Sequence, residues 1–423
     1  MATFRPFYAL RPSEEKAAEV AALPYDVMSS AEARVMVKDA PYSFLHVDRA
    51  EVDLPEGTDL YSDEVYEKAA RNLKQLEECG ALVRDGDRCY YLYTEIMDGR
   101  SQTGIVGCAS IDEYLNGIIK KHELTVAAKE ADRIRHVDVC NANTGIIFLA
   151  FREQPALEKR MGEILEGEEP LYDFVSEDGV RHIVRKVNDP KDIKLFEKCF
   201  AEIPALYIAD GHHRTASAVR VGEKRRAEHP GYTGEEEFNF FLAAAFPASQ
   251  LSIWDYNRVV KDLNGLTEEE FLSRLGKCFE VTCLPDPDGD TEEALASVKP
   301  AKAHTFSMYM SGKWYSLRAL EGSFDPSDTV GRLDVSILQE NVLSPLLGIG
   351  DPRTDSRIAF VGGIRGLAGL KTRVDAGEAA AFALYPTSME DLMSIADESR
   401  IMPPKSTWFE PKLRSGLFIH ELS

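Results

Sequence analysis

Residues 209–214, Ala-Asp-Gly-His-His-Arg, combine the residue types that can hold a phosphate group. The stretch before them, 203–209, is apolar and predicts a buried strand, and 215–228 predicts a helix. Gly211 permits the positive φ or the close backbone approach that a tight strand-to-helix turn needs. A helix that begins there directs unpaired N–H groups and the positive end of its dipole outward, which makes a ready anion site.

The charged side chains of this run strengthen the phosphate hypothesis. Arg214 carries a permanently charged, forked donor that suits phosphate oxygens, and His212 and His213 carry donors that titrate near neutral pH. The alternative is that Asp210 merely caps the helix and the histidines lie on the surface. Four polar or cationic residues directly after a buried strand favour the phosphate.

The same run raises the question of a metal. Neighbouring residues on a helix point to different sides, so His212 and His213 would not chelate one ion together. There is no H-x-x-x-H pattern and no nearby cysteine, which argues against structural zinc. A magnesium ion that bridges phosphates to Asp210 is compatible with the sequence.

A second cluster of chemically active residues lies within 116–145. Its members mix carboxylates, imidazoles, a hydroxyl and an amide with cations: Lys120, Lys121, His122, Glu123, Thr125, Lys129, Asp132, Arg133, His136 and Asn143. Such a mixture can supply a general base and phosphate clamps. Glu123 is the candidate base, because flanking cations would hold it ionised. An ordinary exposed helix could carry the same charges, and both interpretations stay open.

A third cluster lies near the C-terminus, in 402–416. Lys405, Lys412 and Arg414 stand there among prolines and aromatics, which favours an ordered segment. Its cations could close over a bound anion. A loop that docks only for stability is an equally good interpretation.

The elements that must position these clusters alternate between helix and strand. The main expectations are a helix at 62–79, a hairpin of 89–95 with 103–109, a buried strand at 146–152 and a helix capped by Thr267 with Glu270. This mixture predicts an α+β (mixed α/β) fold. We expect three regions: 1–115, 116–255 with the Asp-Gly-His-His-Arg turn, and 256–423.

Composition narrows the function classes. The chain of 423 residues has a formal net charge of −22, which opposes nucleic-acid binding as the main activity. Its seven cysteines include no C-x-x-C pair and favour a reduced compartment. Without a signal-like N-terminus or an apolar run of membrane-spanning length, we expect a cytoplasmic protein that does not enter a membrane.

Several motifs together resemble one family. They are FRPFYALRP, LPYDV, KKHELT with ADRIRH, YIADGHHRTASA and MPPKSTWFEPKLRSGL, in that order. In this combination the chain resembles the DUF1015 family, a group of uncharacterised bacterial and archaeal proteins. The resemblance runs from Phe4 to His420.

The element DGHHR-x-x-A also resembles a box of the ParB/sulfiredoxin superfamily, which includes free-serine kinases. This resemblance implies a ParB/sulfiredoxin-like core in 116–255, elaborated by further α+β regions. It also implies a glutamate that acts as base on the serine hydroxyl. Glu123 is the first candidate for that base, and Glu51 and Glu95 compete with it. Sulfiredoxin chemistry needs a cysteine in this box, and none is present.

The resemblance therefore implies a phosphotransferase that uses ATP or ADP with Mg²⁺ on a small hydroxyl metabolite, with serine as the first candidate. The residues expected to bind phosphate or nucleotide are Gly211, His212, His213, Arg214, Lys121, Arg133 and Lys405. The residues expected to act in catalysis are Glu123, His213 and Asp210, and Asp210 is also the expected metal ligand. A phosphatase of a small phosphoester such as phosphoserine and a ParB-like nucleotide-binding switch are the alternatives.

Overall fold

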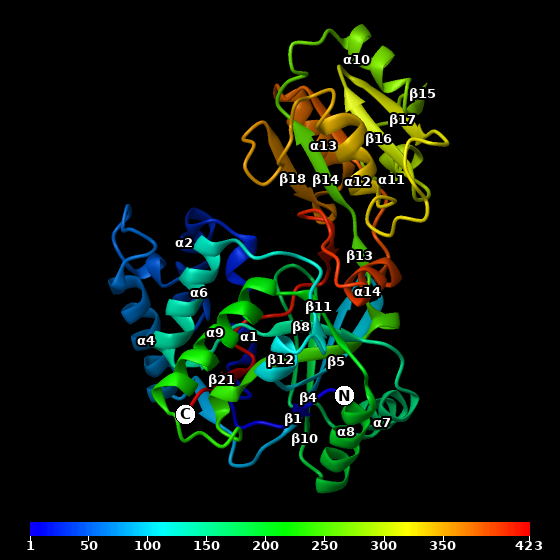
Figure 1. Ribbon diagram of the computed structural model, residues 1–423. Coiled ribbons are helices and arrows are strands. Elements are labelled where there is room, and N and C mark those ends of the chain that lie inside the picture. Colours follow the sequence, from blue (N-terminus) through cyan, green and yellow to red (C-terminus); the bar gives the residue numbers. More distant parts are fainter. The chain divides into compact units, whose positions relative to one another are not determined.

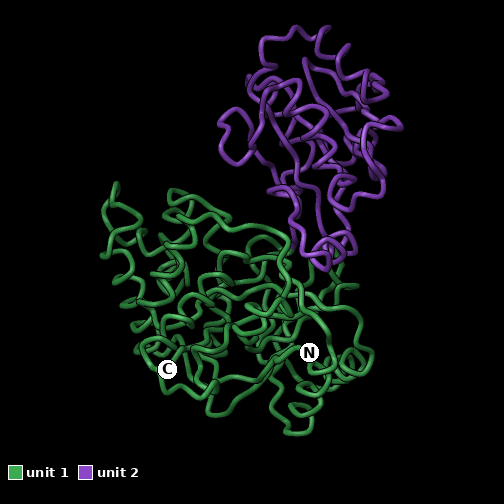
Figure 2. Tube along the Cα trace, in the orientation of Figure 1, with its two compact units in different colours: residues 1–251, 411–423 green, residues 252–410 purple.

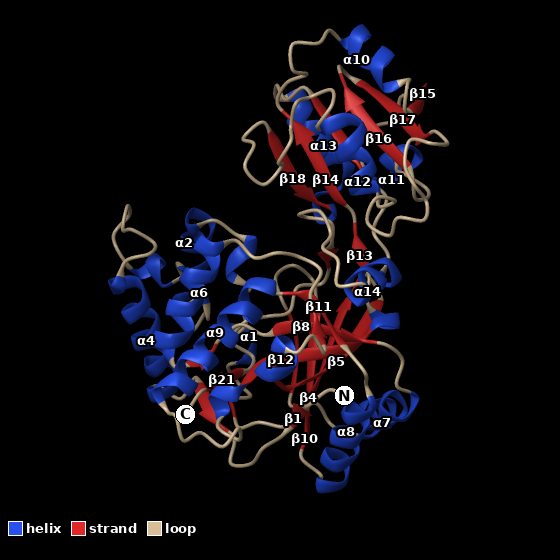
Figure 3. Ribbon diagram, in the orientation of Figure 1, coloured by secondary structure: helices blue, strands red, loops and turns tan.

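The computed structural model describes all 423 residues. Their contacts divide the chain into two units, unit 1 with residues 1–251 and 411–423, and unit 2 with residues 252–410 (Figure 2). Each unit combines helices with sheets, so the predicted α+β class is confirmed (Figure 3). The sequence patterns suggest a break after residue 115, but residues on both sides of that position share one sheet.

Unit 1 is built on a nine-stranded sheet (Figure 1). Its strands, in spatial order, are β6 (Ile119–Lys120), β11 (Leu206–Asp210), β8 (Ile147–Phe151), β12 (Phe240–Pro247), β5 (Arg100–Ser110), β4 (Tyr90–Met97), β10 (Arg181–Val187) and β9 (Tyr172–Val175), and β1 (Phe4–Arg5) pairs with β5. Most neighbours are antiparallel, but β6 pairs parallel with β11. Parallel neighbours end at the same edge of a sheet, so the loops after β6 and β11 emerge together.

Local sequence explains the longest hairpin of this sheet. Strands β4 and β5 pair antiparallel across Asp98 and Gly99, whose φ angles are +51° and +76°. Positive φ at both central residues is what a two-residue hairpin turn of the favoured hand requires. The predicted hairpin is thereby confirmed.

Nine α-helices belong to unit 1. They are α1 (Ala17–Val20), α2 (Ser30–Val37), α3 (Leu45–Asp48), α4 (Asp63–Glu78), α5 (Ile111–Leu115), α6 (Ala127–Cys140), α7 (Pro155–Gly167), α8 (Pro190–Glu202) and α9 (His212–Glu228). Apolar residues of α7 and α8 join the strands in one core, and α6 packs between α4 and α9 (Figure 1). No helix in either unit has the length and apolar character needed to cross a bilayer.

Two sequence expectations for helices are sharpened by the structure. The predicted helix at 62–79 is α4, and its expected apolar face is buried. The predicted helix at 215–228 begins earlier, at His212, so the histidine pair and Arg214 form its first turn. The segment 116–145 contains β6, a loop and helix α6.

The end of the chain returns to unit 1. A four-stranded sheet joins β3 (Leu82–Arg84), β2 (Ala9–Pro12), β21 (Ile419–Glu421) and β7 (Ala142–Asn143) in that order. Strand β21 therefore bridges β2 near the N-terminus and β7 after α6. This pairing places residues 411–423 in the same unit as the Asp210 turn.

Unit 2 has its own sheet and core. Six strands are ordered β15 (Phe279–Cys283), β17 (Lys313–Ala319), β16 (Thr305–Met310), β19 (Ala380–Ala383), β14 (Tyr256–Val260) and β18 (Ile358–Gly362), and β13 (Ile253–Trp254) pairs with β20 (Trp408–Phe409). Its helices are α10 (Glu268–Leu275), α11 (Glu292–Leu295), α12 (Asp334–Leu338), α13 (Gly366–Asp375) and α14 (Met389–Asp397). The predicted capping box of Thr267 with Glu270 is present at the start of α10.

Candidate active site

The turn from β11 into α9 has the geometry of an anion site. Gly211 is the N-cap residue of α9 and has a φ of +91°, a left-handed conformation that favours glycine. The first internal hydrogen bond of the helix runs from the Thr215 N–H to the Gly211 carbonyl, 2.9 Å. No side chain caps this end of the helix. A bound anion would therefore take the place that a capping side chain fills elsewhere.

Asp210 is the acid at the centre of this turn. Its Oδ1 accepts a hydrogen bond from the Gly211 N–H, 2.9 Å, and its Oδ2 lies 3.5 Å from Lys412 Nζ and 3.6 Å from an Arg214 nitrogen. Burial alone raises the pKa of Asp210, but the charges of Lys412 and Arg214 outweigh it and hold the pKa well below its usual range. Asp210 is therefore ionised at neutral pH and fixes two cations beside the turn.

Arg214 is held in place from several sides. Its guanidinium donates to the Ile146 carbonyl, and its side chain is only 10% exposed. Its aliphatic part packs so closely on Gly145 that a Cβ there would lie 3.0 Å from it. The guanidinium is therefore oriented before any ligand binds, which reduces the entropy lost on binding.

Arg214 lines a pocket together with Arg133 of α6. Other residues around this pocket are Tyr25, Asp48 and Thr144. Arg133 lies over the Tyr25 ring, 4.1 Å from its centroid, and its Nε donates to Asp132, 2.8 Å. The structure thus brings together two of the expected phosphate-binding arginines from different helices.

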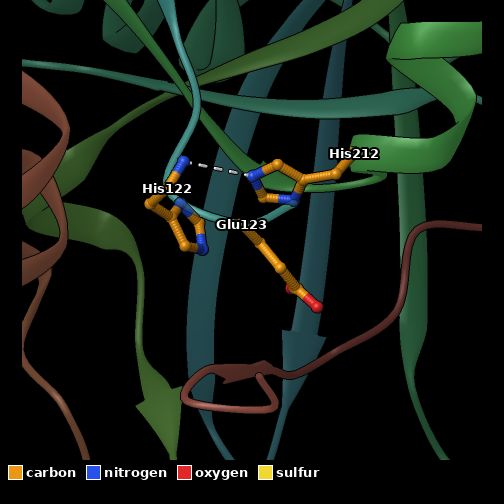
Figure 4. A group of neighbouring side chains, drawn as sticks. All are labelled: His122, Glu123 and His212. Atoms are coloured by element: carbon orange, nitrogen blue, oxygen red, sulfur yellow. Dashed lines mark hydrogen bonds between the residues drawn. The ribbon is translucent and has the colours of Figure 1, made fainter. Parts of the chain in front are cut away.

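The parallel pairing of β6 with β11 brings the second cluster to the Asp210 turn. His122 and Glu123 follow β6, and His212 follows β11, 90 positions beyond His122. Figure 4 shows the three side chains as neighbours, with the His122 N–H directed at His212 Nε2, 3.4 Å away. One ligand atom from each of the three lies within 4.8 Å of the others. Glu123, the candidate base, is thus a neighbour of the turn.

The remaining expected residues of unit 1 differ in their surroundings. His213 Nε2 accepts a hydrogen bond from the Val126 N–H, 2.9 Å, which ties the loop before α6 to the first turn of α9. Lys121 is exposed, and its ammonium lies 5.6 Å from the centroid of the Tyr114 ring. His213 therefore contacts the backbone of the loop before α6.

The C-terminal cluster is divided between the two units. Lys405 belongs to unit 2, where its ammonium lies 5.6 Å from the centroid of the Tyr256 ring. Lys412 belongs to unit 1 and contacts Asp210. Lys412, from the same sequence cluster, therefore supplies a cation to the turn within unit 1.

The two competing glutamates have different environments from Glu123. Glu51 is buried. Its Oε1 lies 3.0 Å from Arg49 Nε and accepts a hydrogen bond from the Ser30 hydroxyl. Glu95 is fully buried and accepts a hydrogen bond from Gln102. Glu123 is partly exposed and lies beside the turn, which suits a base that must meet a substrate.

A second pocket adjoins the first, since both share Tyr25, Asp48, Arg133 and His136 as lining residues. It has a volume of about 250 Å³, just below the range of about 300–1,000 Å³ that is typical of small-molecule sites. Nothing in the sequence pattern pointed to Asp48 as a lining residue. The LPYDV motif was the one available signal for Tyr25.

Comparison with known proteins identifies the family. A family model described as "Protein of unknown function (DUF1015)" matches residues 4–336, well over half of the chain. The chain belongs to the DUF1015 family. No curated protein sequence matches it significantly.

Three solved structures show remote similarity to this DUF1015 member. A free serine kinase in complex with AMP has 14% identity and a TM-score of 0.35, covering 74% of this chain and 90% of that one. A conserved hypothetical protein from Pyrococcus furiosus has 15% identity and a TM-score of 0.33, with coverages of 74% and 93%. C-terminally truncated SbnI from Staphylococcus aureus has 9% identity and a TM-score of 0.37, with coverages of 73% and 84%. TM-scores this low carry no argument about function.

Proposed function

We propose that this protein is a nucleotide-dependent phosphotransferase that acts on a small hydroxyl metabolite. The observation that supports this most is the position of Glu123, a partly exposed carboxylate, beside a turn suited to phosphate. A phosphate site and a base within reach of one another are the two parts that phosphoryl transfer to a hydroxyl needs. Serine is the first acceptor to test, because the DGHHR element resembles free-serine kinases.

The turn would bind the phosphates of ATP or ADP. The start of α9 offers backbone amides and the positive end of the helix dipole. Arg214 offers a pre-oriented guanidinium, and Lys412 adds a second cation near the same carboxylate oxygen of Asp210. Fixed positive charge of this kind stabilises the charge that spreads over the transferred phosphoryl group.

Glu123 would act on the acceptor. Its carboxylate accepts the proton of the hydroxyl while the hydroxyl oxygen forms a bond to the terminal phosphorus. The bond from that phosphorus to the bridging oxygen breaks, and the nucleotide leaves with one phosphate fewer. Such a base contributes about 10²–10⁴-fold to the rate.

Magnesium fits this site through oxygen ligands. Proteins usually hold Mg²⁺ with one or two carboxylates and the substrate phosphates, and Asp210 is an ionised, partly exposed carboxylate at the turn. Asp210 would hold the ion with the nucleotide, and the ion would neutralise phosphate charge there. Lys412 and Arg214 already balance Asp210, so we expect the ion to bind together with nucleotide.

The test is formation of phosphoserine from serine and either nucleotide with Mg²⁺. Glu123→Gln is expected to lower kcat by at least about 10²-fold while the affinity for nucleotide stays within a few-fold. Glu153→Gln, at an exposed glutamate after β8, is the matched control and should keep full activity. Equal activity of Glu123→Gln and the natural protein would contradict the assignment.

Two other outcomes would assign the alternatives. Hydrolysis of phosphoserine without nucleotide would make the protein a phosphatase. Stabilisation by nucleotide with no turnover of any small hydroxyl compound would make it a nucleotide-binding switch.

A further inference from the structure

His122, Glu123 and His212 form a compact group of potential metal ligands in unit 1. Their ligand atoms all lie within 4.8 Å of one another (Figure 4). Three ligands around one tetrahedral ion at about 2.1 Å stand about 3.4 Å apart. Closing the group around an ion therefore needs side-chain shifts of roughly 1 Å or less.

The buried state of His122 is an independent indication of a missing ligand. Its side chain is 1% exposed. The Ile208 carbonyl lies near one ring nitrogen, but neither Nδ1 nor Nε2 makes a hydrogen bond of good geometry. A buried polar group without a partner is costly, and such groups are rare in native proteins. A metal ion between His122 and its neighbours would satisfy one of these nitrogens.

The two imidazoles of the group pack edge to face. Their rings are nearly perpendicular, at 87°, with centroids 4.5 Å apart.

The donor types select the class of ion. Imidazole nitrogens suit zinc, cobalt, nickel, copper and iron, whereas Mg²⁺ and Ca²⁺ prefer oxygen ligands. We propose that His122, His212 and Glu123 bind one divalent transition-metal ion at the carboxyl ends of β6 and β11. The contact from the His122 N–H to His212 Nε2, 3.4 Å, lies at the long limit of hydrogen bonding, and an ion bound to that nitrogen would replace it.

The site has a consequence for catalysis, which rests on the proposed function. Glu123 cannot hold an ion with the same lone pair that accepts the hydroxyl proton. Occupancy by a transition-metal ion would therefore inhibit phosphotransfer. Excess Mg²⁺ would leave the ion in place, because it competes poorly for nitrogen ligands.

The binding test uses full-length protein freed of metal with a chelator. Titration with Zn²⁺ by calorimetry is expected to give one ion per chain, and Co²⁺ is expected to give the intense visible absorption of a four- or five-coordinate complex. His122→Asn and Glu123→Gln should each weaken Zn²⁺ binding by more than about 10-fold. His229→Gln, at an exposed histidine on the same chain, should leave it unchanged.

Binding and inhibition are separate readouts. If His122→Asn fails to fold, Glu123→Gln at the partly exposed position still tests the site. Absence of a one-to-one Zn²⁺ complex, or a complex unaffected by Glu123→Gln, would overturn the proposal. Zn²⁺ binding, together with no phosphotransfer by the metal-free protein given nucleotide and Mg²⁺, would uphold the metal site and refute the proposed function, so the two failures are distinguishable.

Discussion

Gly211 is the residue of the turn whose backbone conformation and close contact with Arg214 both require a glycine. Its φ of +91° is unfavourable for any residue with a side chain, and a Cβ there would lie 3.1 Å from Arg214 Nε. We expect Gly211→Ala to lower the free energy of unfolding by about 1–2 kcal/mol and to weaken phosphate binding, because Arg214 must move. Calorimetric titration with inorganic phosphate and denaturant unfolding measure the two effects.

Gly80 provides the control for this substitution. It also has a positive φ, +77°, but nothing lies within 4 Å of the place its Cβ would occupy. Gly80→Ala should lower stability by a similar amount and leave phosphate affinity unchanged. Equal losses of phosphate affinity in both variants would show that Arg214 and the turn are not coupled.

At the same scale, the sequence identifies candidate residues more readily than it predicts which distant residues lie beside them. The amino acids of the Asp210 turn were recognisable because they are contiguous, and the turn does join a strand to a helix. That Glu123 lies beside His212 depends on strand pairing between distant segments. His122 was one of several candidates in the 116–145 cluster, and the sequence could not single it out, since its burial and poor hydrogen bonding exist only in the folded chain.

Among the elements, the C-terminal segment is held to strand β10 by a buried histidine. The Arg414 guanidinium donates to His182 Nε2, 3.2 Å, and to the Ser176 hydroxyl, 3.0 Å. The Tyr93 hydroxyl lies 2.8 Å from the other ring nitrogen of His182. Burial, with the charge of Arg414, lowers the pKa of His182 to about 3.

This histidine predicts a pH dependence of stability. An unfolded histidine has a pKa of about 6.5, so between pH 6.5 and about 3 the unfolded chain binds a proton that folded His182 does not. The free energy of unfolding should therefore fall as the pH falls through that window, by up to about 1.4 kcal/mol per pH unit for this group. His182→Gln should reduce the slope, measured by urea unfolding from pH 7 to 5 with far-UV circular dichroism.

The exposed His229 is the reference for this experiment. His229→Gln should retain the slope of the natural protein. A His182→Gln profile that coincides with it would refute the assigned proton uptake.

Elements with regular local patterns were predictable from sequence, and irregular ones were not. Helix α4 has a continuous apolar face and the β4–β5 hairpin has a two-residue turn, so both were found. Helix α6 could not be predicted from an apolar face. The surface of α6 that packs against α4 and α9 contains few apolar residues. The two-residue strand β6, which positions Glu123, is too short to show a period.

For the whole molecule, unit 2 is an insertion between two parts of unit 1. Its ends meet, because β13 and β20 pair with Ile253 opposite Phe409. We expect residues 1–251, joined by a short glycine-serine linker to 411–423, to fold cooperatively and to bind Zn²⁺ and phosphate like the full chain. Circular dichroism during thermal unfolding and the same titrations test this.

The tryptophans allow the two units to be followed separately. All three, Trp254, Trp314 and Trp408, lie within unit 2. In the full chain their fluorescence reports unfolding of unit 2, and the excised unit 1 has none. An excised unit 1 that stays unfolded or loses both ligands would show that unit 2 is required for the site.

The contact between Lys412 and Asp210 has a consequence for biosynthesis. A ribosome makes the Asp210 turn first, then the whole of unit 2, and only afterwards Lys412 and β21. A nascent chain stalled within unit 2 therefore lacks both the cation beside Asp210 and the strand that links β2 with β7. The Asp210 turn therefore gains its Lys412 cation only after translation has passed through the whole of unit 2 and residue 412.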